Sequence, residues 1–257
     1  MRLVKRKISG TILLLFLWTL SFANKADQSI VFDSANAAYA TGRYDTAIKL
    51  YESILEKNVE SSELYYNLGN AYYKTNEIGL AILNYERAKK LNPSDEDLIT
   101  NLKLANQRTE DKIEAAPELF ITEWKNGIVN LLNETGWSVL CILLLCFSLI
   151  LMITYIAAGN KKIKKTGFFG GLVFLLITVI IFFIAQHKYE LTKYSADAII
   201  LSSSVTATGS PSEKGTKLFI LHEGTKVTIL QEETEWAEIR IANGNVGWIR
   251  SNSLKKI

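Results

Sequence analysis

This chain has 257 residues. Its amide and aromatic side chains recur at a regular spacing, and such side chains could bind a ligand. Asn36 and Tyr39 recur 34 positions later as Asn70 and Tyr73. Three further pairs keep this offset: Ala47 and Ala81, Ile48 and Ile82, and Tyr51 and Tyr85. A period of 34 predicts stacked helical hairpins, which present a surface to another protein and have no catalytic apparatus of their own.

Groups that could carry catalysis or bind a metal do not cluster along the sequence. The two histidines, His187 and His222, stand at unrelated sites, and His222 has no second histidine, cysteine or carboxylate pair near it in the chain. No nucleophile triad, phosphate loop or dinucleotide fingerprint can be argued. Cys141 and Cys146 lie within an apolar block, where we expect them to pack as small apolar residues. We therefore expect neither an enzyme nor a bound metal or cofactor.

The charge balance argues against a nucleic-acid partner, and the N-terminus predicts export. The net charge is +3, and the parts expected to fold carry no Lys/Arg block. Residues 1–23 combine a basic start, a short apolar core and small residues at Ser21 and Ala23, the pattern of a signal peptide. We expect cleavage after Ala23. The alternative, an uncleaved anchor, leaves the following residues on the same side of the membrane.

Two longer apolar blocks predict a membrane hairpin. Residues 137–158 would form about 33 Å of helix, enough to cross a hydrocarbon core of about 30 Å, and residues 167–186 are also within the spanning range. Neither block contains a charge, so we expect an anchor and not a channel. Before them, residues 117–136 place Phe120 and Trp124 on one side at helical spacing, which predicts a segment that lies along the membrane surface or continues into the first span.

The connector between the two blocks sets the topology. Residues 159–166 contain four lysines: Lys161, Lys162, Lys164 and Lys165. Short lysine-rich loops stay in the cytoplasm. Both flanks of the hairpin should therefore lie on the extracytoplasmic side of the inner membrane.

Residues 24–116 resemble the tetratricopeptide repeat family. In the second repeat the family's slots are filled by Tyr65, Leu68, Gly69, Tyr72, Ala81, Tyr85, Ala88 and Pro93. Gly69 and Ala81 are small enough for the two helices of a hairpin to approach closely. A third repeat begins but has Lys103 in the slot of Gly69, so we expect Leu98–Ile113 to be a lone helix that caps the stack.

This resemblance implies a ligand groove on the inner face of the first helix of each repeat. The matching positions are Phe32, Asn36, Tyr39, Tyr66, Asn70, Tyr73 and Lys74, with Gln107 and Arg108 on the cap. Ring faces beside amides suit an extended peptide or a helix. Some members of the family hold a terminal carboxylate with a lysine where this chain has Phe32, so that mode is not expected here. The alternative is that the tyrosines only pack between repeats.

Residues 195–257 change to short β-rich runs separated by turn residues. Apolar residues alternate with polar ones at Val227, Ile229, Trp236, Ile239 and Ile241. Tight turns are predicted at Glu223-Gly224 and Asn243-Gly244. The order of pieces, which ends in NGNVGWI, resembles the bacterial SH3-like domain. Such barrels bind peptides, often from the cell wall, or pack against a neighbouring domain. We expect Trp236 to lie in the barrel core, the alternative being a ligand platform, and Trp248 likewise to be structural.

Together these features predict a multi-domain protein: an all-α tetratricopeptide-repeat stack, two transmembrane helices and a C-terminal all-β SH3-like barrel. This order, with the stretches KLFILHEGTKVTIL and GNVGWI, resembles the BatE-type proteins of the Bacteroides aerotolerance (Bat) group. The resemblance implies a scaffold in a membrane complex beside von Willebrand A-type membrane proteins and a MoxR-type ATPase, linked to aerotolerance or envelope stress. Two alternatives remain: an envelope sensor whose barrel binds cell-wall peptides, and a transporter subunit, which the uncharged spans disfavour.

Overall fold

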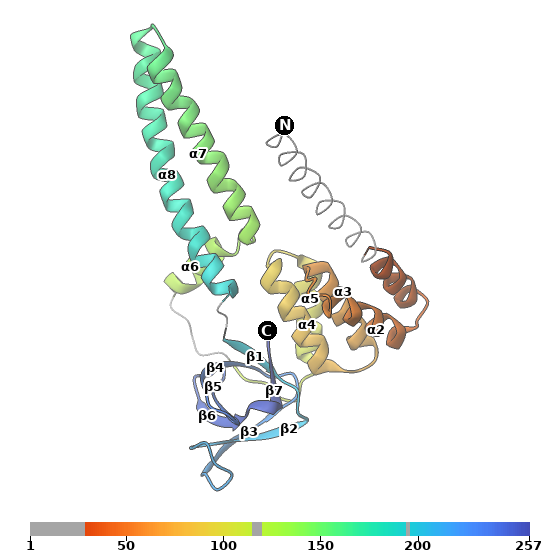
Figure 1. Ribbon diagram of the computed structural model, residues 1–257. Coiled ribbons are helices and arrows are strands. Elements are labelled where there is room, and N and C mark those ends of the chain that lie inside the picture. Colours follow the sequence, from red (N-terminus) through yellow and green to blue (C-terminus); the bar gives the residue numbers. More distant parts are fainter. Residues whose placement is uncertain (1–28, 115–119, 194–195) are drawn as a thin grey trace, which may run out of the picture.

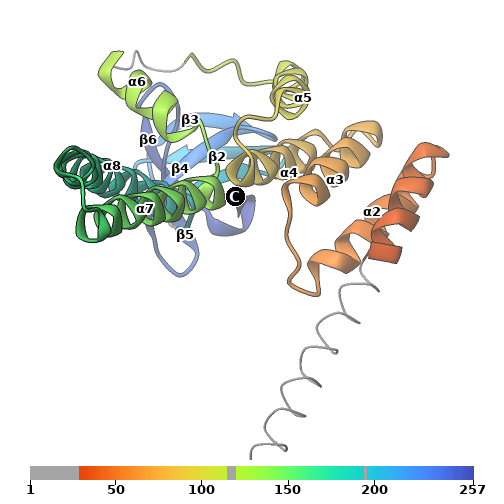
Figure 2. The same cartoon turned by 90° about the horizontal axis from the view of Figure 1, so that it is seen from above.

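The computed structural model describes residues 29–114, 120–193 and 196–257. They form a helical stack, a long helical hairpin and a β-barrel, which confirms the predicted fold class (Figure 1). The stack and the barrel lie side by side, and the hairpin projects away from both (Figures 1 and 2). The predicted signal peptide at residues 1–23 lies outside the described residues.

The described part of the stack contains helix 29–40, α2 (Tyr44–Leu55), α3 (Ser62–Lys74), α4 (Ile78–Leu91) and α5 (Glu96–Gln107). Side chains cap two of these helices. The Ser61 hydroxyl accepts the Leu64 N–H at 3.1 Å, and the Asp95 carboxylate accepts the Leu98 N–H at 3.0 Å. Each cap satisfies a backbone donor that the first turn of a helix leaves open, so these residues fix where α3 and α5 begin.

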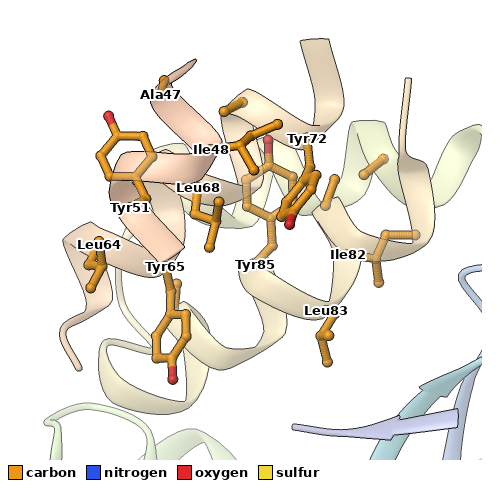
Figure 3. Close-up of a cluster of buried hydrophobic side chains, with 14 of the residues drawn as sticks. Ala47, Ile48, Tyr51, Leu64, Tyr65, Leu68, Tyr72, Ile82, Leu83 and Tyr85 are labelled. Atoms are coloured by element: carbon orange, nitrogen blue, oxygen red, sulfur yellow. The ribbon is translucent and has the colours of Figure 1, made fainter. Parts of the chain in front are cut away.

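Close packing of α3 against α4 depends on Gly69. A Cβ at this position would lie 2.7 Å from Tyr85 Cδ1 and 3.3 Å from the carbonyl oxygen of Ala81, so glycine is required. Tyr85 fills the space between the helices, as Figure 3 shows, and is 1% exposed. The predicted role of the small residues is thereby confirmed.

The capping helix is shorter than the sequence suggested. We expected it to reach Ile113, but α5 ends at Gln107. The Lys112 ammonium donates to the backbone oxygens of Asn106, Gln107 and Thr109 at 3.3, 2.9 and 2.7 Å. These bonds occupy carbonyl groups that the end of a helix leaves open, and the chain then runs towards the barrel.

The hairpin consists of α7 (Glu134–Ala157) and α8 (Lys161–Lys193), preceded by the short helix α6 (Phe120–Val129). By length and composition, α7 and α8 are able to cross a membrane. Small residues bring them together. A Cβ on Gly167 would lie 2.8 Å from the carbonyl oxygen of Leu151, and the Ser148 hydroxyl donates to the carbonyl oxygen of Gly171 at 2.8 Å.

The loop predicted at residues 159–166 is mostly helical. Only residues 158–160 connect α7 to α8, and the four lysines lie on the first turns of α8 at the tip of the hairpin (Figure 1). The Asn160 side chain accepts the Lys162 N–H at 2.8 Å and starts the helix there, and lysine is a good helix former. All four side chains are exposed: Lys161, Lys162, Lys164 and Lys165.

The barrel is one antiparallel sheet in the order β3-β2-β6-β5-β4-β1-β7. Its strands are β1 (Asp197–Ile200), β2 (Ser204–Thr208), β3 (Lys217–His222), β4 (Lys226–Glu232), β5 (Trp236–Arg240), β6 (Val246–Arg250) and β7 (Leu254–Lys256). Gly224 and Gly244 have φ values of +87° and +93° in the two turns that the sequence predicted. The barrel core is formed by Ala198, Ile200, Ala207, Leu221, Val227, Ile229, Ala237, Ile239, Ile241 and Ile249.

Trp236 does not lie in this core, contrary to expectation, and neither does Trp248. Both side chains are half-buried on the outer face of the sheet, while Ala237, Ile239 and Ile249 point inward. Trp236 stands three positions from Ile239, and residues an odd number of positions apart on a strand face opposite sides of a sheet. Trp236 therefore cannot share the face of Ile239.

Candidate partner-binding groove and the domain interface

Two adjoining hollows lie along the first helices of the repeats and α5. The larger has a volume of about 360 Å³ and is lined by Tyr39, Tyr66, Asn70, Tyr73, Lys74, Tyr85, Asn101 and Leu104. The smaller has a volume of about 200 Å³ and is lined by Asn36, Tyr39, Tyr51, Asn67 and Asn70. Tyr39 and Asn70 line both hollows, which are together called the groove below.

The floor of the groove repeats one hydrogen-bond arrangement at the interval of 34 residues. The Asn36 amide oxygen accepts from the Tyr51 hydroxyl at 2.6 Å and from Asn67 Nδ2 at 3.1 Å. One repeat later, the Asn70 amide oxygen accepts from the Tyr85 hydroxyl at 2.7 Å and from Asn101 Nδ2 at 2.9 Å. Each arrangement joins the two helices of one hairpin to the first helix of the next unit.

These bonds fix the orientation of both amides. The oxygens of Asn36 and Asn70 each accept two hydrogen bonds, and their Nδ2 groups donate to no group in the described parts of the chain. An amide nitrogen has two donors, so each position offers N–H groups to a ligand. Asn67 and Asn101 were not among the residues predicted for the groove, although they also stand 34 positions apart.

Burial makes the tyrosines of the groove harder to ionise than a solvent-exposed tyrosine. Desolvation raises the pKa of Tyr51 to about 12, and it also raises the pKa of Tyr39 and Tyr85. The Tyr51 and Tyr85 hydroxyl groups therefore remain hydrogen-bond donors to the two asparagines across the neutral pH range.

The other predicted residues are divided between the groove and its surroundings. Lys74 lines the larger hollow, and Arg108 stacks its guanidinium over the ring of Tyr73 at 5.1 Å while bonding to Asn76. Phe32 lines neither hollow and packs on Tyr51, with ring centroids 5.9 Å apart. Gln107 is exposed at the end of α5 and also lines neither hollow. The structure thus brings six of the predicted residues into the groove: Asn36, Tyr39, Tyr66, Asn70, Tyr73 and Lys74.

The outer face of the barrel carries a second cluster, formed by the two tryptophans and Arg250. Trp236 pairs with Arg250 across β5 and β6, and Trp248 lies diagonally next to Trp236 on the same face. The Arg250 guanidinium stacks over the Trp236 ring at 4.9 Å and bonds to Glu213 and Glu235. The cluster is a half-exposed aromatic surface with charges beside it.

Helix α4 forms one side of the interface between stack and barrel. The Glu223 carboxylate accepts the Gly79 N–H at 3.0 Å at the start of α4, where a negative charge is favoured. Lys226 joins Glu86 of α4 at 2.9 Å to Asp197 of β1 at 3.2 Å. Burial alone would lower the pKa of Lys226, but the two carboxylates outweigh burial and raise the pKa, so the ammonium stays charged.

Asp111, after α5, forms the other side of the interface. Its Oδ1 lies 2.8 Å from His222 Nδ1, and its Oδ2 accepts the His222 backbone N–H at 2.7 Å and the Thr225 hydroxyl at 2.6 Å. Glu110 Oε1 lies 3.4 Å from His222 Nε2. Glu110 and Asp111 are far from His222 in the chain, and no local pattern marks the contact, so the sequence alone does not indicate it.

Two families match parts of the chain. The Tetratricopeptide repeat family matches residues 32–96, and the Bacterial SH3 domain family matches residues 209–255. Both are interaction modules that bind proteins or cell-wall material, and neither is a family of enzymes. No curated protein matches the chain. The first match includes the groove residues from Asn36 to Tyr85, and the second includes both tryptophans of the barrel surface.

Proposed function

We propose that this chain is a membrane-anchored scaffold whose groove binds an extended segment of a partner protein. The observation that carries the proposal is the pair Asn36 and Asn70, one repeat apart, with fixed oxygens and open Nδ2 groups. A peptide backbone presents one carbonyl oxygen per residue, so two such donors can hold it irrespective of its side chains. The rings of Tyr39, Tyr66 and Tyr73 add contact area beside them.

Two cationic side chains beside the groove favour a ligand that carries a negative charge. Lys74 and Arg108 are exposed beside the larger hollow, and neither forms an ion pair within the described residues. A carboxylate on the bound segment would form charge-assisted hydrogen bonds with them. The groove therefore suits a segment in which Asp or Glu stands near apolar residues.

A variant of the full chain tests this function. Asn70→Ala combined with Tyr73→Ala removes one open amide and one ring of the groove, whereas Lys49→Ala changes an exposed side chain of α2 that lines neither hollow. After cross-linking in its native membrane, the wild type and Lys49→Ala should retain the same envelope protein, and the double variant should retain much less. Equal retention by all three forms would contradict the proposal.

The proposed location is the inner membrane, with α7 and α8 as spans. The lysine cluster at the tip of the hairpin supports a cytoplasmic tip, because lysine-rich connections stay inside. Stack and barrel would then both be extracytoplasmic, in agreement with the signal peptide proposed at residues 1–23. Phe120 and Trp124 of α6 are 77% and 71% exposed, which supports contact of this helix with the membrane surface.

Cysteine labelling tests the location. In a chain whose native Cys141 and Cys146 are replaced by alanine, a cysteine at Thr46 of α2 should react with an impermeant maleimide outside the cell. A cysteine at Lys164 should react only after the membrane is opened. The reverse pattern would exclude this topology.

The complex in which the scaffold acts is the finer part of the proposal. The order of repeats, hairpin and SH3-like barrel resembles the BatE-type proteins of the Bat group, which supports a complex with von Willebrand A-type membrane proteins and a MoxR-type ATPase. The role would then be in aerotolerance or envelope stress. Co-purification with the full chain should recover a von Willebrand A-type protein, and its absence from every cross-linked product would refute this assignment.

The barrel surface favours one alternative, an envelope sensor that binds cell-wall peptides. Trp236, Trp248 and Arg250 form a half-exposed surface of rings beside charges, and aromatic faces of this kind bind peptides. Saturable binding of muropeptides to the full chain, lost in Trp236→Ala and kept in Asn70→Ala, would favour the sensor over the scaffold.

A further inference from the structure

A third hollow, of about 540 Å³, lies where α4, the end of α8 and β1 meet. In Figure 1 the end of α8 lies at the base of the hairpin, near the label α6, and faces β1 and α4. It shares no lining residue with the groove. Four lysines and three carboxylates line it, so its charge depends on how these groups pair.

Lys188 is a buried cation without a bonded counter-charge. Its side chain is 5% exposed, and its ammonium donates at 2.9 Å to Asn130 Oδ1, a neutral acceptor. Within the described residues it forms no ion pair, and Glu134 attracts it only from a longer distance. A buried ammonium is normally paired with an anion, because removing the charge from water is costly.

The carboxylates of the hollow are largely engaged by other groups. Lys226 binds both Glu86 and Asp197, and Glu190 accepts a hydrogen bond from Gln186. Lys89, on the exposed side of α4, forms no ion pair in the described parts of the chain. A buried and an exposed ammonium are therefore both available to an anion that enters the hollow.

We propose that this hollow binds a phosphate group, with Lys188 as its buried cation and Lys89 as its exposed one. The phosphate can come from two sources, the headgroup of an anionic phospholipid or free inorganic phosphate. Lys188 follows the apolar stretch of α8, so the hollow would lie at the membrane surface, within reach of headgroups. Only the lipid source rests on the proposed insertion of the hairpin; binding of phosphate itself does not.

Native mass spectrometry of the full chain in a neutral detergent tests the site. The probes are phosphatidylglycerol, diacylglycerol without a phosphate, and inorganic phosphate as a competitor. The variants are Lys188→Gln, which removes the buried charge, Lys188→Arg, which keeps it, and Lys89→Gln, which changes only an exposed side chain. Lys49→Gln is the control for loss of one positive charge elsewhere on the stack.

The proposal predicts that the wild type, Lys188→Arg and Lys49→Gln retain phosphatidylglycerol. Lys188→Gln and Lys89→Gln should each bind it roughly tenfold more weakly, the effect of one lost charge-assisted hydrogen bond. Displacement of the lipid by inorganic phosphate identifies free phosphate as a ligand, and resistance to displacement identifies the headgroup. If diacylglycerol is retained as well as phosphatidylglycerol, or if Lys89→Gln and Lys188→Gln bind like the wild type, the site does not exist.

Discussion

The Asp111 carboxylate and the His222 ring join the segment after the helical stack to the barrel, with Oδ1 and Nδ1 2.8 Å apart. The same carboxylate binds Thr225 at the other end of the β3–β4 turn. Within this turn a Cβ on Gly224 would lie 2.7 Å from Thr109 Cγ2 and 3.0 Å from Ile82 Cδ1 of α4, so the backbone of the barrel meets the stack directly. Ile113 also packs against the barrel core. The barrel is therefore completed by residues that precede the α7–α8 hairpin.

This contact predicts that docking of the barrel depends on pH. The bond to Asp111 raises the pKa of His222 above its ordinary value of 6.5. The stabilisation that protonated His222 gives to the docked barrel is therefore complete below pH 6.5 and is lost as the pH rises through the raised pKa. Burial opposes ionisation of Asp111, but bonds from His222 and Thr225 outweigh it and lower the pKa of Asp111 below 3.8. The stabilisation that ionised Asp111 gives to the docked barrel is thus present above pH 3.8 and is lost as the pH falls through the lowered pKa.

Hydrogen exchange of the β3–β4 turn measures this dependence in the full chain. Protection should be greatest between pH 3.8 and 6.5, after correction for the intrinsic exchange rate, and should fall on the alkaline side. His222→Gln keeps a polar side chain that does not titrate, so the alkaline loss should disappear. The same alkaline loss in both proteins would show that another group is responsible.

Gly69→Ala should destabilise the stack. The added methyl group would overlap the Tyr85 ring, and overpacking of this kind costs about 1–3 kcal/mol of unfolding free energy. Gly127→Ala is the matched control, because a Cβ there meets no atom within 4 Å. Thermal unfolding followed by circular dichroism should show a lower melting temperature for Gly69→Ala alone. A melting temperature equal to that of the wild type would mean that α3 and α4 are further apart.

Asn70→Ala should cost more stability than Tyr85→Phe. Loss of the Asn70 oxygen leaves the Tyr85 hydroxyl without its acceptor, at about 1–3 kcal/mol for an unsatisfied buried group, and also removes one of the two hydrogen bonds of Asn101 Nδ2, which keeps its bond to the Tyr66 hydroxyl. Tyr85→Phe removes a single bond, worth about 1 kcal/mol. Chemical denaturation of the two single variants and of the combined variant measures the loss of unfolding free energy in each. Equal costs would argue against the shared hydrogen-bond arrangement.

Gly167→Val should separate α7 from α8 near the lysine cluster. A Cβ at Gly167 would lie 2.7 Å from Thr154 Oγ1 and 2.9 Å from the Tyr155 backbone nitrogen, and a backbone contact cannot rotate away. Distances between spin labels on the two helices, measured in lipid, should increase in this variant. Gly159→Ala, where a Cβ meets nothing within 4 Å, should leave them unchanged. An unchanged distance in Gly167→Val would contradict the close crossing.

The sequence predicted those features that leave a periodic or local pattern. The interval of 34 residues predicted the repeats, because small and aromatic side chains must recur where helices meet. The resemblance to the tetratricopeptide repeat family implied the groove and six of its residues. Long uncharged stretches predicted α7 and α8. The same interval also relates Asn67 to Asn101, so the complete hydrogen-bond arrangement could have been found by aligning the repeats.

The remaining features depend on tertiary contacts or competing local effects. The bond between Asp111 and His222 joins residues 111 positions apart and has no local signature. Trp236 was expected in the barrel core, although the two-residue period of a strand puts it opposite Ile239. The lysine-rich segment predicted as a loop is helical, because the Asn160 side chain caps the start of the helix and lysine favours helix.

Photo-cross-linking in intact cells tests whether the groove binds a partner protein. A photoreactive amino acid would replace Tyr73 in the groove or, as the control, Lys49 on the exposed side of α2 in the full chain. A partner-binding groove predicts that a single envelope protein is cross-linked from position 73, is absent from position 49 and is lost when Asn70→Ala is added. Cross-linking from both positions alike, or none from position 73, would contradict a partner-binding groove.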